Sequence, residues 1–386
     1  MPTPIPPYSL KTLLGGISPR RFMVEYWQKK PLLVRQALPG FQGLLGKNKL
    51  IELACREEAE SRLVLHQRGR WRLEHGPFEA EALEHLPARG WSLLVQGVNH
   101  FLPEADRLLR AFNFVPYTRL DDLMVSFAPP GGGVGPHFDS YDVFLIQGLG
   151  RRRWEISAQT DLTLVESAPL RILEHFEPEQ SWELEPGDML YLPPKYAHNG
   201  VALTDCMTYS VGFRAPSAQE IAVQFLTYLQ DQLQLEGMYA DPDLQPSRHP
   251  GQIDAKLIGR LAAMIGRIRW SQADIRDFAG RYLSEPKPNI FFAPPARPLP
   301  AKAFAQRIEK VGLQLDPKTL LLYQNRRFYI NGEPYLASAD TAAVLRRLAD
   351  QRALAPGRHA PAAIECLYDW YRAGFLQPGS LQPRSK

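Results

Sequence analysis

The chain has 386 residues, of which 45% are hydrophobic and 22% are charged. These values are typical of a soluble globular protein, and the length predicts two or three domains. The formal net charge of +4 is too small to indicate nucleic-acid binding on its own.

The first strong local signal is a helix over residues 18–30. Ser18 is a suitable N-cap, and Phe22 and Tyr26 follow on one face. From about residue 61 to 127, short alternating apolar runs such as 62–65 and 91–95 are separated by turn residues. These runs predict strands.

Strand signals are densest between residues 122 and 213. The runs concerned are 123–128, 141–147, 153–157, 181–184, 189–192 and 207–213. Glycine- and proline-containing turns separate them, for example at 131–133 and 185–188. Many short strands with regular turns predict an all-β sandwich or barrel for this part of the chain.

The pattern then becomes helical. Ser217, with Glu220 three residues later, predicts a capping box and a helix to about Leu235, and 252–266 and 271–283 also have helical periodicity. Residues 284–300 contain six prolines in 17 residues, which no helix or central strand tolerates. We therefore expect a domain boundary in this segment.

The last part of the chain predicts a small mixed domain. Its elements are helices at 301–311, 339–352 and 361–373 and strands at 319–323 and 327–330, with Asn331-Gly332 as a turn signal. This combination resembles a winged-helix module. Residues 301–386 carry 13 Lys or Arg against 7 Asp or Glu, a net +6 that a solvated basic face also explains.

The three cysteines, Cys55, Cys206 and Cys366, form no CxxC pair. This spacing excludes a structural zinc site made of thiolates and argues against a disulfide framework.

The first residues lack the pattern of a signal peptide, and no apolar stretch approaches the length of a membrane span. We expect a cytoplasmic protein without a membrane partner.

Three residues form a candidate metal site. His137 and Asp139 point the same way if their segment is an extended strand, and His198 follows the Pro193-Pro194 bend. Two imidazoles and one carboxylate suit Fe(II), because they leave coordination positions open for a co-substrate and oxygen. The alternative is that both histidines are packed and hydrogen-bonded near a turn. The glycine-rich stretch 131–135 before His137 favours the metal site.

A second candidate is a cation on an apolar strand face. Arg152 shares a face with Trp154 and Ile156, where a guanidinium is costly unless it is paired. The distal carboxylate of 2-oxoglutarate would pair with it, and Ser126 could donate its hydroxyl to the same co-substrate. The alternative is an arginine at the end of the barrel that reaches water.

These motifs resemble the JmjC-type bacterial ribosomal oxygenases. The segments that carry the resemblance are 26–32, 75–78, 121–127, 130–139, 141–144, 147–148, 150–154, 184–188 and 209–216. Together they cover most of residues 20–245. The resemblance implies an α+β protein in which a double-stranded β-helix (jelly-roll or cupin) core is followed by a helical dimerisation region and a C-terminal winged helix. We place these parts at 1–215, 216–284 and 301–386, with a Pro-rich linker at 285–300.

The resemblance also implies a function. The family consists of protein hydroxylases that use Fe(II), 2-oxoglutarate and O2, and its bacterial members hydroxylate C3 of an arginine in a large-subunit ribosomal protein. By this resemblance His137, Asp139 and His198 are the metal ligands, and Arg152 binds 2-oxoglutarate. Asp122 and Tyr141 match positions that hold the substrate side chain, and a carboxylate with an aromatic ring suits a guanidinium.

Two other functions stay open. One is a JmjC hydroxylase or demethylase that acts on a histidine or lysine of another protein. The other is a non-catalytic cupin-like assembly factor. For the leading hypothesis we expect a large-subunit ribosomal protein as substrate, a homodimer through residues 217–283 and no direct nucleic-acid binding.

Overall fold

The computed structural model describes residues 9–379, which form two compact units. The first unit comprises the chain up to Ala215, Pro286–Thr319 and the chain from Asp340 onward. The second unit comprises Pro216–Glu285 and Leu320–Ala339. The four-part domain division drawn from the sequence stays a prediction.

Two antiparallel sheets form the centre of the first unit. The larger has the strand order β1-β9-β6-β11-β5-β4-β2-β3, and the smaller has the order β10-β7-β8. In chain order the strands are β1 (Leu32–Val34), β2 (Ser61–Gln67), β3 (Arg70–His75), β4 (Trp91–Val95), β5 (Leu120–Ala128), β6 (Val143–Leu149), β7 (Arg152–Ser157), β8 (Gln180–Leu184), β9 (Met189–Leu192), β10 (Ala197–Ala202) and β11 (Cys206–Phe213). This is the predicted jelly-roll arrangement of many short strands.

One face of the large sheet carries the main hydrophobic core. Short helices contribute to this part of the unit: α1 (Leu10–Leu13), α2 (Pro19–Glu25), α3 (Lys47–Ala54), α4 (Ala80–Glu84), the 3₁₀ helix η1 (Val98–His100) and α5 (Pro103–Arg110). At the centre, Phe22 packs edge-on against Tyr191 with ring centroids 4.9 Å apart, and Phe144 lies 4.8 Å from Tyr191. All three rings are fully buried. The opposite face of the sheet is therefore left for the site.

The helix predicted for residues 18–30 is shorter than expected. Ser18 caps it as predicted, with Oγ accepting from the Arg21 amide, but α2 ends at Glu25. Gln28 adopts a positive φ of 56°, and its backbone N–H donates to the Tyr191 hydroxyl. A tertiary hydrogen bond thus outweighs continued helical periodicity at this point.

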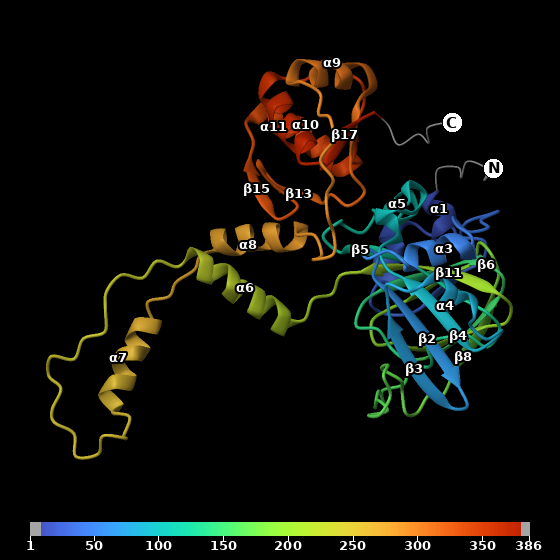
Figure 1. Cartoon of the computed structure of the whole chain (residues 1–386), viewed down its shortest axis with the longest axis horizontal. Coiled ribbons are helices and arrows are strands. Elements are labelled where there is room, and N and C mark those ends of the chain that lie inside the picture. The colour runs from blue at the N-terminus through green and yellow to red at the C-terminus, as the bar shows by residue number, and fades with distance from the viewer. Residues whose placement is uncertain (1–8, 380–386) are drawn as a thin grey trace. The chain divides into compact units, whose positions relative to one another are not determined.

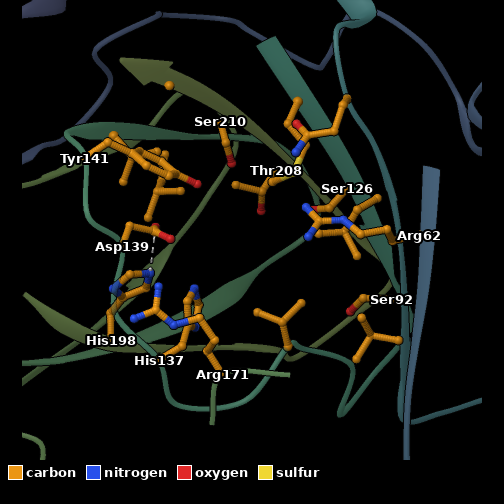
Figure 2. A pocket seen from close by; sticks show the side chains of 18 of the residues that line it. Arg62, Ser92, Ser126, His137, Asp139, Tyr141, Arg171, His198, Thr208 and Ser210 are labelled. Carbon is orange, nitrogen blue, oxygen red and sulfur yellow. Dashed lines mark ion pairs between the residues drawn. The ribbon is translucent and has the colours of Figure 1, made fainter. Parts of the chain in front are cut away.

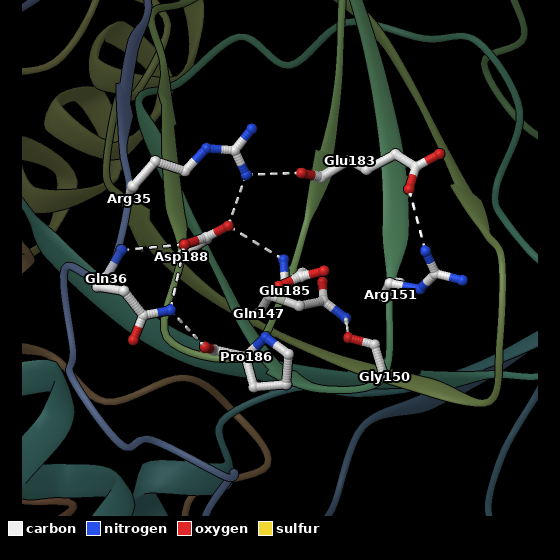
Figure 3. Close-up of polar contacts among 9 residues, drawn as sticks. All are labelled: Arg35, Gln36, Gln147, Gly150, Arg151, Glu183, Glu185, Pro186 and Asp188. Atoms are coloured by element: carbon white, nitrogen blue, oxygen red, sulfur yellow. Dashed lines mark hydrogen bonds and ion pairs between the residues drawn. The ribbon is translucent and has the colours of Figure 1, made fainter.

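A buried aspartate fixes the turn that precedes β9 (Figure 3). Asp188 is 3% exposed and accepts hydrogen bonds from Arg35 Nη1 (2.6 Å), the Gln36 amide (2.9 Å) and the Glu185 amide (3.1 Å). Gly187 before it has φ 93°, a conformation that favours glycine. The turn therefore sets where β9 begins, and β9 leads through Pro193-Pro194 into β10.

The rest of the first unit contains three helices and a short sheet. The helices are α9 (Ala301–Val311), α10 (Ala339–Gln351) and α11 (Pro361–Arg372). The sheet has the order β16-β12-β17, formed by β12 (Leu313–Leu315), β16 (Ala353–Leu354) and β17 (Leu376–Pro378). Both the helices and the lack of regular structure over residues 285–300 agree with the sequence.

The second unit holds helices α6 (Ala218–Gln232), α7 (Ala255–Ile265) and α8 (Gln272–Ser284) and the sheet of β13 (Leu321–Gln324), β14 (Arg327–Ile330) and β15 (Glu333–Leu336). Figure 1 shows α8 beside this sheet, where a Cβ at Gly280 would meet the Tyr329 ring at 2.2 Å. The predicted turn at Asn331-Gly332 joins β14 to β15 with φ values of 50° and 88°. Ser217 caps α6 as predicted, while Glu220 accepts from the Tyr282 hydroxyl.

Within residues 9–379, no helix has both the length and the apolar character needed to cross a membrane.

Candidate metal and co-substrate site

A cavity of about 520 Å³ lies between the two sheets of the first unit. Strand alternation decides what faces it. On β5, Asp122 and Ser126 line the cavity, whereas Val125 between them belongs to the core. On β11, Thr208 and Ser210 line it in the same way. The cavity wall is therefore polar on strands whose other face is apolar.

The three predicted metal ligands meet in this cavity. His137, Asp139 and His198 each offer one ligand atom, and these atoms lie within 4.8 Å of one another. Figure 2 shows Asp139 turned toward His198, with Asp139 Oδ2 3.7 Å from His198 Nε2. Among the residues that the structure describes, this is the single cluster of its kind.

The route by which these side chains come together differs from the expected one. His137 is not in a regular strand but in an isolated bridge to His198, with reciprocal backbone hydrogen bonds of 2.9 and 2.8 Å. His198 itself lies on β10, which is outside the predicted strand runs, opposite Ile156 of β7. The expectation of a ligand strand over 137–139 was therefore wrong. The bridge replaces the strand in aligning the two imidazoles.

Backbone carbonyls orient both imidazoles. His137 Nδ1 lies 2.9 Å from the Gly135 carbonyl oxygen, and His198 Nδ1 lies 2.9 Å from that of Tyr196. A carbonyl only accepts, so each Nδ1 must carry the proton. Burial lowers the pKa of His198 to about 4, and the neighbouring His137 adds to this effect. His198 is thus neutral at physiological pH, with the Nε2 lone pair free for a metal.

Glycine is required just before the first ligand. Gly135 has φ 80°, and a Cβ there would meet Ile172 and Trp71 at 2.7 Å. The predicted sharp turn into His137 therefore has two causes, a left-handed backbone and close packing.

The guanidinium of Arg152 is buried beside the Trp154 ring, whose centroid lies 5.6 Å from Cζ. Arg152 is 4% exposed on β7, on the same face as Trp154 and Ile156, as strand parity predicted. Its Nε and Nη2 atoms have no hydrogen-bond partner among residues 9–379. A buried guanidinium with two unused donors is costly on its own. Arg152 thus fits a ligand carboxylate, and Ser126, 5% exposed, lines the same cavity.

The two predicted substrate residues are at the cavity but differ in exposure. Asp122 is 7% exposed, and its Oδ2 accepts from the Gly97 amide at 2.9 Å. Burial raises the pKa of Asp122 to about 6, against the opposing effect of Lys287. Tyr141 is 40% exposed at the rim; burial of its hydroxyl and the carboxylates of Asp139 and Asp122 raise its pKa. At neutral pH the pair is a carboxylate beside a neutral phenol.

Sequence reasoning missed three cations of the cavity wall. Arg62 comes from β2, Arg171 places its guanidinium 4.8 Å from the Phe138 ring, and Lys287 comes from the Pro-rich segment. With the Gln96 amide oriented to donate to Asp122 Oδ2 (3.2 Å), its oxygen accepts from Arg62 Nη2 (3.1 Å). An arginine in the alternating run of β2 was a detectable signal, whereas nothing local marked Arg171 or Lys287.

Comparison with known proteins agrees with this site. A family model described as JmjC domain matches residues 107–221, and one described as ROXA-like winged helix matches residues 267–377. The "Ribosomal protein uL16 3-hydroxylase" of Escherichia coli (strain K12) is 40% identical over 280 residues, which are 72% of this chain and 74% of that protein. This chain belongs to the JmjC-type ribosomal oxygenases.

Further similar proteins support the same family. A "Probable ribosomal oxygenase" of Haemophilus influenzae is 39% identical over 236 residues, or 60% of this chain and 56% of that protein. The X-ray structure of E. coli ycfD has a TM-score of 0.81 at 34% identity and covers 94% of this chain and 98% of its own. A structure of that ribosomal oxygenase in complex with cobalt and 2-oxoglutarate has a TM-score of 0.79 at the same identity and coverage.

The family and the fold class expected from the sequence are therefore confirmed. As a ribosomal oxygenase of the JmjC family, the chain is a 2-oxoglutarate-dependent oxygenase, which argues against a non-catalytic assembly factor.

Proposed function

We propose that this ribosomal oxygenase hydroxylates C3 of an arginine in ribosomal protein uL16, with Fe(II), 2-oxoglutarate and O2. The assignment of uL16 as the substrate is supported by the 40% identity to the E. coli uL16 3-hydroxylase over about three quarters of each chain. The assignment of arginine as the target side chain is supported by the buried Asp122 carboxylate in the cavity wall, which can pair with a guanidinium. Because ribosomal proteins are the substrates, we infer that the protein acts in the cytoplasm.

His137, Asp139 and His198 would hold the iron. Their ligand atoms are grouped, and both imidazoles present Nε2 because backbone carbonyls take the Nδ1 protons. Bound iron, with 2-oxoglutarate and oxygen, supplies the oxidation of one unactivated C–H bond. Arg152 would pair with the distal carboxylate of 2-oxoglutarate, using the two donors that lack a partner, and Ser126 would add a hydroxyl donor.

Asp122 and Tyr141 would hold the substrate arginine. A carboxylate accepts two parallel hydrogen bonds from a guanidinium, and the half-exposed Tyr141 ring can stack on its plane. The Gly97 amide and the Gln96 side chain fix the Asp122 carboxylate, so its direction does not depend on the substrate. This arrangement places one side chain in a set position relative to the metal site, which is what regioselective oxidation needs.

The proposal is tested with overlapping peptides of uL16 from the same organism. Incubation with Fe(II), 2-oxoglutarate and air should add a single oxygen to one arginine, located by tandem mass spectrometry, with stoichiometric succinate. The matched control replaces that arginine by lysine and should remain unmodified. Oxidation of a histidine peptide alone, or loss of methyl groups from lysine, would show that one of the two alternative substrates is correct.

We also infer that the protein is a homodimer through its helical segment. Three apolar side chains of α6 are exposed, Ile221, Val223 and Leu226. Helix α7 has an apolar face that includes Ile258 and Ile265, yet none of its residues is buried. An amphipathic helix of this kind normally buries its apolar face. A second copy of the chain would cover these residues.

Leu226→Glu is expected to convert the dimer to a monomer, because it places a charge in the apolar contact. The measurement is size-exclusion chromatography with light scattering. Gln224→Glu is the matched control, since it adds the same charge at an exposed polar position of the same helix. A wild-type monomer, or a Leu226→Glu protein that stays dimeric, would argue against this interface.

A further inference from the structure

Lys287 reaches the cavity from a distant part of the sequence. Every other described residue of the cavity wall lies between Arg62 and Phe213, whereas Lys287 belongs to the Pro-rich segment. Pro286 and Pro288 flank it, and each proline fixes its own φ. The local backbone is therefore stiff, and it presents the lysine side chain to the wall.

The Lys287 ammonium pairs with two consecutive carboxylates. Its Nζ lies 3.1 Å from both carboxylate oxygens of Asp121 and 3.9 Å from Oδ2 of Asp122. Burial lowers the pKa of Lys287, but Asp122 and Asp121 raise it by more, so the group stays protonated. In the protein without substrate, the negative charge of Asp122 is therefore partly balanced by the ammonium of Lys287.

A substrate cation would meet this ammonium at the same carboxylate. Two positive charges that share one carboxylate repel each other, and this repulsion is weakened where water reaches the pair. The Lys287 side chain is 43% exposed, so it can move toward water or stay on Asp121 without burial cost. Asp122, 7% exposed, has no such freedom.

We propose that Lys287 is a specificity-determining residue that occupies the cation position at Asp122 until the substrate guanidinium displaces it. The proposal rests on the assignment of Asp122 to the substrate. A guanidinium is permanently charged and can replace the ammonium at the carboxylate. An imidazole is mostly neutral above its ordinary pKa of about 6.5, so a histidine side chain cannot do so. Lys287 thereby restricts the exchange at Asp122 to cationic side chains, and this exchange weakens the binding of arginine itself.

The test compares Lys287→Met, Lys287→Arg and the wild type. Lys287→Met should lower the KM for the arginine-containing uL16 peptide by about two- to fivefold, because partly exposed ion pairs contribute little. Lys287→Arg keeps a cation in place and should restore the wild-type KM. Arg297→Met is the matched control, since it removes an exposed cation from the same segment away from the cavity.

A second measurement separates this proposal from the proposed function. Anaerobic binding of the arginine peptide and of its norleucine analogue is followed by fluorescence anisotropy. Lys287→Met should tighten binding of the arginine peptide alone. Hydroxylation by the wild type without that gain would overturn the role of Lys287 and leave the function intact. Tighter arginine binding without any hydroxylation would overturn the function instead, and equal effects on both peptides would show a merely structural role for Lys287.

Discussion

Asp139→Ala is expected to reduce 2-oxoglutarate turnover by more than about 100-fold, because loss of even an outer-shell partner of a metal site costs about 10- to 100-fold. Asp139 is the single carboxylate of the cluster, and the two imidazoles that remain can bind a metal only as neutral ligands. They cannot balance the charge of a divalent ion or complete a three-sided ligand set. The measurements are succinate formation and calorimetric binding of Mn(II) as a redox-stable substitute for Fe(II).

The matched control is Glu166→Ala, which removes an exposed carboxylate outside the cavity wall. It should leave both readouts at wild-type values. His137→Ala and His198→Ala should resemble Asp139→Ala, since each also removes a ligand. A protein without Asp139 that still bound Mn(II) at wild-type affinity would show that the metal lies elsewhere.

The metal ligands could be predicted because their signals are local. Gly135 precedes His137 by two residues, and the two ligands of the HxD motif, His137 and Asp139, are also only two residues apart. The burial of Arg152 was predictable for the same reason, since parity along a strand depends only on its neighbours. The two-residue alternation of side chains along a strand was enough to place the Arg152 guanidinium on the same face as Trp154 and Ile156.

Other features depended on contacts that no local pattern contains. Strand β10 reads Ala-His-Asn-Gly-Val-Ala, without apolar alternation, and it forms because it pairs with β7 over six residues. The early end of α2 results from the hydrogen bond between Gln28 and Tyr191, 163 residues apart. Lys287 reached the cavity wall by tertiary structure alone. In each case contacts between distant parts of the chain decide the structure, and local sequence propensity does not.

Arg152→Met is expected to raise the KM for 2-oxoglutarate by at least about 30-fold. Truncating one partner of a buried charge pair costs about 2–5 kcal/mol, and each 1.4 kcal/mol is tenfold. The KM is measured from succinate formation at saturating peptide. Arg151→Met is the matched control: Arg151 is half-exposed, its Nη1 lies 3.4 Å from Glu183, and it does not line the cavity. It should leave the KM for 2-oxoglutarate unchanged.

The same substitution, Arg152→Met, is expected to weaken 2-oxoglutarate binding but not to destabilise the protein without ligand. A buried guanidinium with unused donors destabilises the fold until a carboxylate arrives, so methionine at position 152 should be neutral or raise the melting temperature. With Mn(II) present, 2-oxoglutarate at about 100 times its wild-type Kd should stabilise the wild type by about 2.7 kcal/mol and Arg152→Met, which binds at least about 30-fold more weakly, by about 1 kcal/mol or less. If Arg152 were only a structural residue, its loss would lower the melting temperature of the protein without ligand, and 2-oxoglutarate would stabilise the variant as much as the wild type. The sign of the change without ligand therefore distinguishes a co-substrate cation from a packing residue.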